Sequence, residues 1–330
     1  MKKTLLSCVI LLSCATMGTA IDNNTVEIVY NGTTATVTVA NNISKYITVN
    51  SGTSSHVSIT QSADFAGINP TTTNTDGEIY YALKGTSTDG EFYLEGAYKC
   101  EVDLNGLTLT NPSGPALNIQ NGKRVAISAK KSTTNTLSDG ANETYKGCIH
   151  VKGHTKLKGK GTLNVTGNSA HAIYSKEYLE IKNITLNVKA AQKDGIHCKE
   201  YFLLESGTVS ISGVGDDGIQ CELDGLTSTG TTTGHEEEDS GNFYMEDGTL
   251  TISNYTGKAI KVAGTITYSG GKQNFNTADT EINATDIAQV QNPDEDVKFY
   301  NLLGQQVDKN QIAGIYIAKG RNSIRKILAQ

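Results

Sequence analysis

Residues 171–221 read HAIYSKEYLEIKNITLNVKAAQKDGIHCKEYFLLESGTVSISGVGDDGIQC. Within this stretch Ile173, Ile196 and Ile219 recur every 23 residues (196 − 173 and 219 − 196). A fixed period of this length is typical of a solenoid, whose coils bury their apolar side chains only against neighbouring coils. The repeat predicts that residues 23 apart stack on one another at about 4.8 Å, the spacing of neighbouring strands.

The composition indicates an all-β chain. The 330 residues include 34 Gly, 4 Pro and no Trp, and short alternating runs such as Thr162–Val165 and Thr208–Ile211 recur. The pattern predicts a solenoid of about 23-residue coils over residues 78–275. Two stretches, 130–147 and 225–241, break the register and are predicted to be inserted loops on one side of the stack.

The two ends of the chain differ from the repeat. Residues 21–77 alternate as strands with Asn-Gly and Ser-Gly turn signals. They are predicted to form an N-terminal β-strand cap, because an open solenoid end exposes apolar side chains and unpaired strand groups. Residues 291–330 leave the coil pattern and are predicted to form a small C-terminal β-module.

The formal net charge is −6, and no basic block follows a phosphate backbone, so nucleic acid is not an expected partner. Residues 1–20 have a basic start, a short apolar run and a small-residue end, which predicts a secretory signal peptide. A competing hypothesis takes Leu11–Cys14 as similar to a lipobox, with Cys14 lipidated. Both place the mature protein outside the cytoplasm, secreted or at the cell surface.

Four cysteines lie beyond the signal segment, at positions 100, 148, 198 and 221. Cys198 and Cys221 are 23 apart and are predicted to face inward as stacked free thiols, an interpretation favoured over a disulfide. The sequence has no CxxC pair and no His/Cys cluster with the spacing of a zinc site.

Two successive coils carry an aspartate at one position, Asp194 and Asp217, each followed by Gly-Ile. Two carboxylates about 4.8 Å apart repel by roughly 3 to 4 kcal/mol at an effective dielectric of about 20. Ca²⁺ relieves this repulsion because it takes oxygen ligands at roughly 2.3–2.6 Å. The predicted calcium ligands are Asp194, Asp217 and the adjacent Asp216, although Asp-Gly is also an ordinary turn pair.

Other coils depart from the acidic pattern at this position, with Gly147, His171 and Lys258. The departures predict few calcium sites, and Lys258 is expected to place its ammonium against Asp217. The glycines after the two aspartates, Gly195 and Gly218, are expected to permit a tight corner around the ion.

The residues that follow the isoleucines point outward and form a polar, partly aromatic stripe. They are predicted to contact sugar: His150, Tyr174, His197 and Gln220, followed in the last coil by Lys261. Two positions further on, Lys176 and Lys199 are expected to pair with uronate carboxylates. The alternative is a solvated face without a ligand. The acidic run 235–239 is expected to be a solvated loop.

Several separate motifs, in order, resemble the family of carbohydrate-binding domain-containing proteins over about Glu78 to Gly270. The resemblance is carried by Tyr81–Gly90, Leu104–Leu107, Pro115–Ile119, Asn135–Gly140 and the two Asp-Gly-Ile turns. It implies a right-handed parallel β-helix similar to pectate lyases. It further implies calcium-dependent binding of an acidic polysaccharide such as polygalacturonate, without lyase activity.

The tail resembles the C-terminal sorting domain of the type IX secretion system in residues 297–305 and Gly314–Ile317. The resemblance implies outer-membrane secretion and surface-attachment machinery as partners. The alternative is a β-module that closes the solenoid.

Three functions follow from these patterns. The leading hypothesis is non-catalytic, calcium-dependent binding of acidic polysaccharide. The second is a polysaccharide lyase with Lys176 or Lys199 as the base. The glutamate after each lysine argues against this second hypothesis, because it would favour the charged form of the lysine. A related possibility is a glycoside hydrolase with Asp194 and Asp217 as the carboxylate pair. The third is a metal-stiffened adhesin or spacer.

Overall fold

The computed structural model describes residues 21–67, 77–225, 238–275, 298–301, 305–307, 314–319 and 324–329. The predicted signal peptide, Cys14 and most of the acidic run lie outside them. The chain is all-β, with 57% strand and 4% helix. None of the helices in these ranges is long and apolar enough to cross a bilayer.

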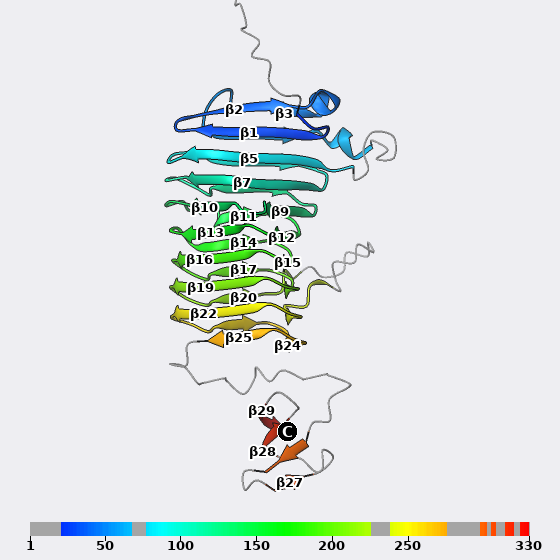
Figure 1. Ribbon diagram of the computed structural model, residues 1–330, viewed down its shortest axis with the longest axis vertical. Helices are drawn as coiled ribbons and strands as arrows, with labels where there is room; N and C mark the ends of the chain where they lie inside the picture. The colour runs from blue at the N-terminus through cyan, green and yellow to red at the C-terminus, as the bar shows by residue number, and fades with distance from the viewer. Residues whose placement is uncertain are drawn as a thin grey trace, which may run out of the picture.

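The chain winds as a parallel β-solenoid with three strands per coil (Figure 1). The coils build two long sheets, a 16-stranded one called sheet A and a 9-stranded one called sheet B. Each coil contributes one strand to sheet B and two strands to sheet A. Sheet A has two arms, which diverge from the long strand β7 (Cys100–Thr110). The strands of sheet B are β3 (Ile47–Val49), β4 (His56–Gln61), β6 (Glu91–Gly96), β8 (Leu117–Asn121), β11 (Gly147–Val151), β14 (His171–Ser175), β17 (Ile196–Cys198), β20 (Ile219–Cys221) and β23 (Ile260–Val262).

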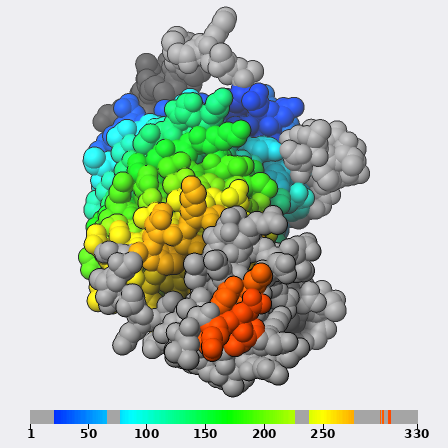
Figure 2. All heavy atoms as spheres, turned by 60° about the horizontal axis from the view of Figure 1, so that its bottom comes forward, coloured from blue at the N-terminus to red at the C-terminus, as the bar shows by residue number. Residues whose placement is uncertain are grey.

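The first arm of sheet A carries β9 (Val125–Ala129), β12 (Thr155–Gly159), β15 (Leu179–Lys182), β18 (Phe202–Leu204), β21 (Phe243–Met245) and β24 (Ile266–Tyr268). The second arm carries β10 (Thr134–Ser138), β13 (Thr162–Gly167), β16 (Thr185–Ala191), β19 (Thr208–Val214), β22 (Thr249–Tyr255) and β25 (Lys272–Phe275). Figure 2 shows these coils as one continuous surface, from the blue first strands to the yellow and orange last ones.

The predicted register is confirmed. Ile173 pairs with Ile196 and Ile196 with Ile219, in parallel strands, and all three side chains are fully buried. Cys198 and Cys221 lie in the same inward column as free thiols. Their sulfur atoms are 3.7 Å apart, and no disulfide joins them. Burial raises the pKa of the Cys198 thiol well above its usual range, so these cysteines act as small apolar side chains.

The expected insertion at 130–147 is wrong. Residues Thr134–Ser138 form β10, which pairs with β7 and β13 in the regular stack. The coil is hidden in the sequence because Asn135 occupies the position that Leu163 fills in the next coil. Asn135 is fully buried, and its Oδ1 accepts hydrogen bonds from the backbone N–H groups of Gly106 and Leu107 at 2.9 Å each.

The N-terminal strands continue the stack. Strand β1 (Thr25–Asn31) pairs antiparallel with β2 (Thr34–Val39) and parallel with β5 (Ile79–Ser87). Two short 3₁₀ helices accompany them, η1 (Asn41–Tyr46) and η2 (Ala63–Gly67). In the tail, the described strands form an antiparallel sheet of β26 (Lys298–Tyr300), β27 (Gln306–Val307), β28 (Gly314–Lys319) and β29 (Ile324–Ala329).

The glycines of the Asp-Gly-Ile turns are required by packing. Neither Gly195 nor Gly218 has a positive φ angle. A Cβ on Gly218 would lie 2.5 Å from the Ala259 carbonyl oxygen and 2.5 Å from a methyl carbon of Ile252. The glycine therefore lets sheet B and the second arm of sheet A approach each other closely.

Gly218→Ala is therefore expected to lower the free energy of unfolding by about 1–3 kcal/mol, the usual cost of overpacking a core. Gly122→Ala is the matched control, because its Cβ would meet no atom within 4 Å, and it should change stability by less than about 0.5 kcal/mol. Chemical denaturation of both variants measures the difference. If the two variants were equally stable, the packing around Gly218 would not require a glycine.

Candidate functional site

The predicted sugar stripe lies in register on the outer face of sheet B. His150 pairs with Tyr174, Tyr174 with His197, and His197 with Gln220. The rings of His150 and Tyr174 stack with their centroids 5.1 Å apart, and those of Tyr174 and His197 at 5.3 Å. The coil register thus builds one continuous column of side chains across four coils.

Two rings of this column are less accessible than the sequence analysis expected. Tyr174 is 5% exposed and His197 is 6% exposed. The faces of the Tyr174 ring are occupied by its two neighbours, and the ammonium of Lys146 lies 5.5 Å from its centroid. These rings therefore offer edges to a ligand, whereas Gln220 and the half-buried His150 reach the surface.

A column of lysines runs beside the rings: Lys176 and Lys199, expected from the sequence, and Lys152, which the sequence analysis missed. Lys152 follows His150 by two positions, as Lys176 follows Tyr174, so the same spacing could have identified it. Lys152 and Lys176 are exposed, and neither makes an ion pair with any described residue. Lys199 lies 3.8 Å from a carboxylate oxygen of Glu222.

Lysines on the first arm of sheet A are arranged differently. The ammonium of Lys156 lies 2.9 Å from Glu180 and 2.5 Å from Glu205, and Lys182 lies 2.6 Å from Glu205. These cross-strand pairs neutralise that face. Sheet B therefore carries a column of lysines whose charge is largely available to a ligand.

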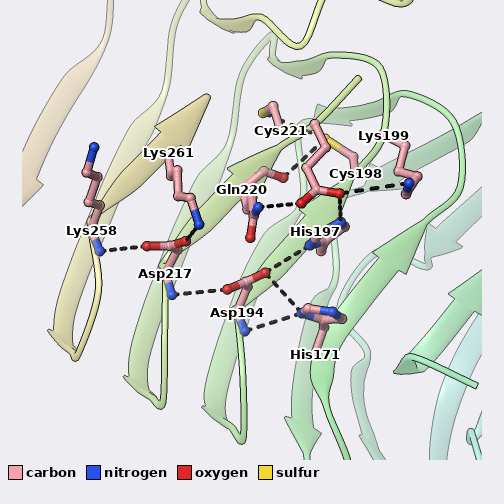
Figure 3. Close-up of polar contacts among 11 residues, drawn as sticks. His171, Asp194, His197, Cys198, Lys199, Asp217, Gln220, Cys221, Lys258 and Lys261 are labelled. Carbon is pink, nitrogen blue, oxygen red and sulfur yellow. Dashed lines mark hydrogen bonds and ion pairs between the residues drawn. The ribbon is translucent and has the colours of Figure 1, made fainter. Parts of the chain in front are cut away.

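The Asp-Gly-Ile turns lie at the edge of this face (Figure 3). Asp194 is 1% exposed. Its Oδ2 lies 3.1 Å from His171 Nδ1 and 2.9 Å from His197 Nδ1, and its Oδ1 accepts the backbone N–H of Asp217 at 3.1 Å. Burial alone would raise the pKa of Asp194, but the two histidine rings against its Oδ2 hold this pKa well below its usual range.

Asp217 is also 1% exposed. Its Oδ1 accepts the backbone N–H of Lys258 at 2.7 Å, and its Oδ2 lies 3.0 Å from the ammonium of Lys261. The sequence analysis expected this ammonium from Lys258, three residues earlier in the same coil. The hydrogen bond to Asp217 raises the pKa of Lys261.

The three carboxylates predicted to bind calcium do converge. Asp194, Asp216 and Asp217 each offer an oxygen, and these oxygens lie within 4.8 Å of one another. A Cβ on Gly257 would meet the Asp217 and Asp216 Oδ1 atoms, at 2.4 and 2.6 Å, so the glycine leaves the space into which both carboxylates point. The donor set is hard and anionic, which suits Ca²⁺, but a cation must compete with Lys261.

A second cluster was not expected from the sequence. His154 Nε2 lies 3.0 Å from Glu177, 3.2 Å from Glu238 and 3.7 Å from Glu200. Burial raises the pKa of Glu200 to about 8, with His154 opposing the shift and Glu177 adding to it. His154, Glu177 and Glu200 are each 23 residues apart, and this spacing was a usable signal. Glu238 follows the insertion after Asp224 and lies outside it.

These contacts bear on the enzymatic hypotheses. Glu177 and Glu200 turn toward His154, so the sequence argument that they hold Lys176 and Lys199 in the charged form is not supported. Asp194 and Asp217 are buried and contact protein groups through both oxygens of each. They therefore do not flank a surface site where a glycosidic bond could lie.

Glu200 gives a pH dependence that can be measured. Its folded-state pKa of about 8 lies above the ordinary glutamate value of 4.5, so between these values the native state holds a proton that the unfolded state has released, and stability falls as the pH rises. Glu200→Gln should remove on the order of 1–3 kcal/mol of this fall between pH 5 and pH 8.5, measured by urea unfolding. The exposed Glu246→Gln is the charge-matched control, and an unchanged pH slope in Glu200→Gln would contradict the assignment.

A search of curated proteins finds none that matches the chain. A solved structure described as the polysaccharide lyase-like protein from C. thermocellum, in a gadolinium derivative, superposes with a TM-score of 0.55 at 19% identity, covering 75% of this chain and 99% of that one. This similarity supports the fold. The model of the carbohydrate-binding domain-containing family matches residues 66–298, and the chain therefore belongs to the family of carbohydrate-binding domain-containing proteins.

Proposed function

We propose that the outer face of sheet B binds an acidic polysaccharide of the polygalacturonate type, without cleaving it. The observation that carries the proposal is the lysine column, in which the exposed Lys152 and Lys176 have no ion pair among the described residues, in contrast to the ion-paired lysines of the first arm. Lys199 continues the column at 3.8 Å from Glu222. Membership of a carbohydrate-binding family supports a polysaccharide as the ligand. The available positive charge favours an anionic one.

The column favours a chain that runs along the solenoid axis. Its lysines come from consecutive coils, so an extended polymer meets one ammonium about every 4.8 Å. Gln220 and His150 border the column and can donate or accept hydrogen bonds to hydroxyl groups. Burial lowers the pKa of His150 to about 4, so its ring is neutral at physiological pH and acts as a polar contact.

Calcium belongs to the same proposal. We place it at Asp216 and Asp217, with Asp194 as the third carboxylate. Bound there, Ca²⁺ would supply a positive charge at the edge of sheet B that attracts uronate carboxylates. It would replace the ammonium of Lys261, whose side chain is 45% exposed, as the partner of Asp217.

The first test measures binding to polygalacturonate by the double variant Lys152→Ala/Lys176→Ala. Surface charge contacts contribute about 0.2–1 kcal/mol each, so affinity should fall roughly 3- to 30-fold and the salt dependence should weaken. Lys123→Ala/Lys131→Ala removes the same charge from two exposed turns and should leave affinity nearly unchanged. If both double variants lost the same affinity, the effect would come from the change in net charge and not from the lysine column.

The same assay separates the alternatives. Neutral galactan should not bind, and absorbance from unsaturated uronide should stay flat. A rising absorbance would establish a lyase with a lysine of this column as the candidate base. Calcium binding without retention of any polysaccharide would support the spacer.

The calcium site is tested by titration calorimetry in a chelator-treated protein. Asp217→Asn should abolish calcium binding, because it removes a central carboxylate. Lys261→Ala should strengthen it several-fold, because the competing ammonium is gone. A Lys261→Ala variant with unchanged or weaker calcium affinity would place the ion elsewhere.

We also propose that the protein is exported. The supporting observations are the signal-like residues 1–20, the lipobox-like Cys14 and the sorting-domain-like tail. Mass spectrometry of the mature chain identifies the N-terminus as Ile21 or a lipidated Cys14 and shows whether the tail is removed. A cytoplasmic chain with both ends intact would refute export.

A further inference from the structure

The cluster of His171, Asp194 and His197 shares Asp194 with the calcium site and His197 with the stripe on sheet B, but it adds two imidazole nitrogens that the calcium site lacks. Figure 3 shows both histidines directed at one carboxylate. The side chains of the three residues are 8%, 1% and 8% exposed. His171 is the residue that replaces aspartate in the coil preceding Asp194, so the stack changes here from two oxygen donors to a mixed nitrogen and oxygen set.

The hydrogen positions of His197 are constrained from both sides. Its Nδ1 lies 2.9 Å from Asp194 Oδ2, and its Nε2 lies 3.3 Å from a carboxylate oxygen of Glu222. A neutral imidazole has one N–H and can donate to only one of these carboxylates. If the proton is on Nε2, then Nδ1 directs a lone pair at Asp194, and a cation must lie between them.

His171 presents the same conflict. Its Nδ1 accepts the backbone N–H of Asp194 at 3.3 Å and also lies 3.1 Å from Asp194 Oδ2. A neutral ring that accepts the N–H has its lone pair, not a proton, near the carboxylate.

The spacing suits a small metal ion. Zinc ligands lie about 2.0–2.1 Å from the ion, so two ligands in a tetrahedral site are about 3.3 Å apart. The two nitrogen-to-oxygen distances here are 3.1 and 2.9 Å. The contact of His197 Nε2 with Glu222 is also the carboxylate–histidine arrangement that commonly orients a metal-binding imidazole.

We infer that His171 Nδ1, Asp194 Oδ2 and His197 Nδ1 bind a borderline divalent transition metal such as Zn²⁺, with Glu222 as a positioning residue. The imidazole nitrogens select against Ca²⁺, which prefers oxygen. The site is therefore distinct in chemistry from the calcium site, although Asp194 borders both. Three protein ligands leave one coordination position for water or a ligand oxygen.

The test is titration of the chelator-treated full chain with Zn²⁺, alongside the visible absorption spectrum with Co²⁺. The wild-type protein should take up one tight equivalent and give a Co²⁺ spectrum of mixed nitrogen and oxygen coordination. His171→Gln/His197→Gln should weaken binding about 100-fold or more. Glu222→Gln, at a partly exposed position, should fold normally and weaken zinc binding about 10- to 100-fold.

Controls distinguish this site from others. His56→Gln removes an exposed histidine and should leave zinc binding intact, as should Asp216→Asn, which is expected to weaken calcium alone. His154→Gln tests the second histidine cluster. Absence of zinc uptake by the wild-type protein, or loss of the tight equivalent only in His154→Gln or His56→Gln, would overturn the inference.

Discussion

The register between parallel coils is the constraint on which the rest of the structure depends. Backbone hydrogen bonds at the Asp-Gly-Ile turns, such as Gly195 N–H to Asp217 O and Ile196 N–H to Gly218 O at 3.0 Å each, hold the coils at one offset. Side chains at equivalent positions therefore cannot move apart along the stack. An apolar column gains from this arrangement, whereas a column with two carboxylates requires neighbouring groups to compensate the charge.

The compensation comes from both ends of the acidic pair. His171 and His197 face Asp194 on one side, and Lys261 faces Asp217 on the other. The two carboxylates are thus held by protein groups before any ion arrives, and cation binding here is an exchange of partners. Such a site selects among cations more sharply than an open acidic column does. A cation binds only if it interacts with the carboxylates more strongly than the proton or ammonium that it replaces.

The sequence predicted those features that repeat every 23 residues: the isoleucine column, the inward thiols and the convergence of Asp194 with Asp217. It failed where the period is interrupted or disguised. Asn135 hid a regular coil by hydrogen bonding in place of an aliphatic residue. The alignment placed Lys258 and Lys261 at their correct coil positions, but the ammonium that turns to Asp217 is that of Lys261, and a period does not give the direction of a side chain. The burial of Tyr174 likewise depends on how His150 and His197 stack on its ring, which the period aligns but does not orient.

The overall charge of −6 opposes the approach of an acidic polymer, so the arrangement of charge must decide binding. Screening limits exposed charges to about 8 Å at physiological ionic strength, and a polymer on sheet B therefore responds mainly to the groups beneath it. Lysines occur on both exposed faces, but those on the first arm are neutralised by Glu180 and Glu205 within the sheet. Lys152 and Lys176 have no such partner among the described residues. Both the first arm of sheet A and sheet B are built of parallel strands. They thus differ in charge because glutamates stand beside the lysines on the first arm and not beside Lys152 and Lys176 on sheet B.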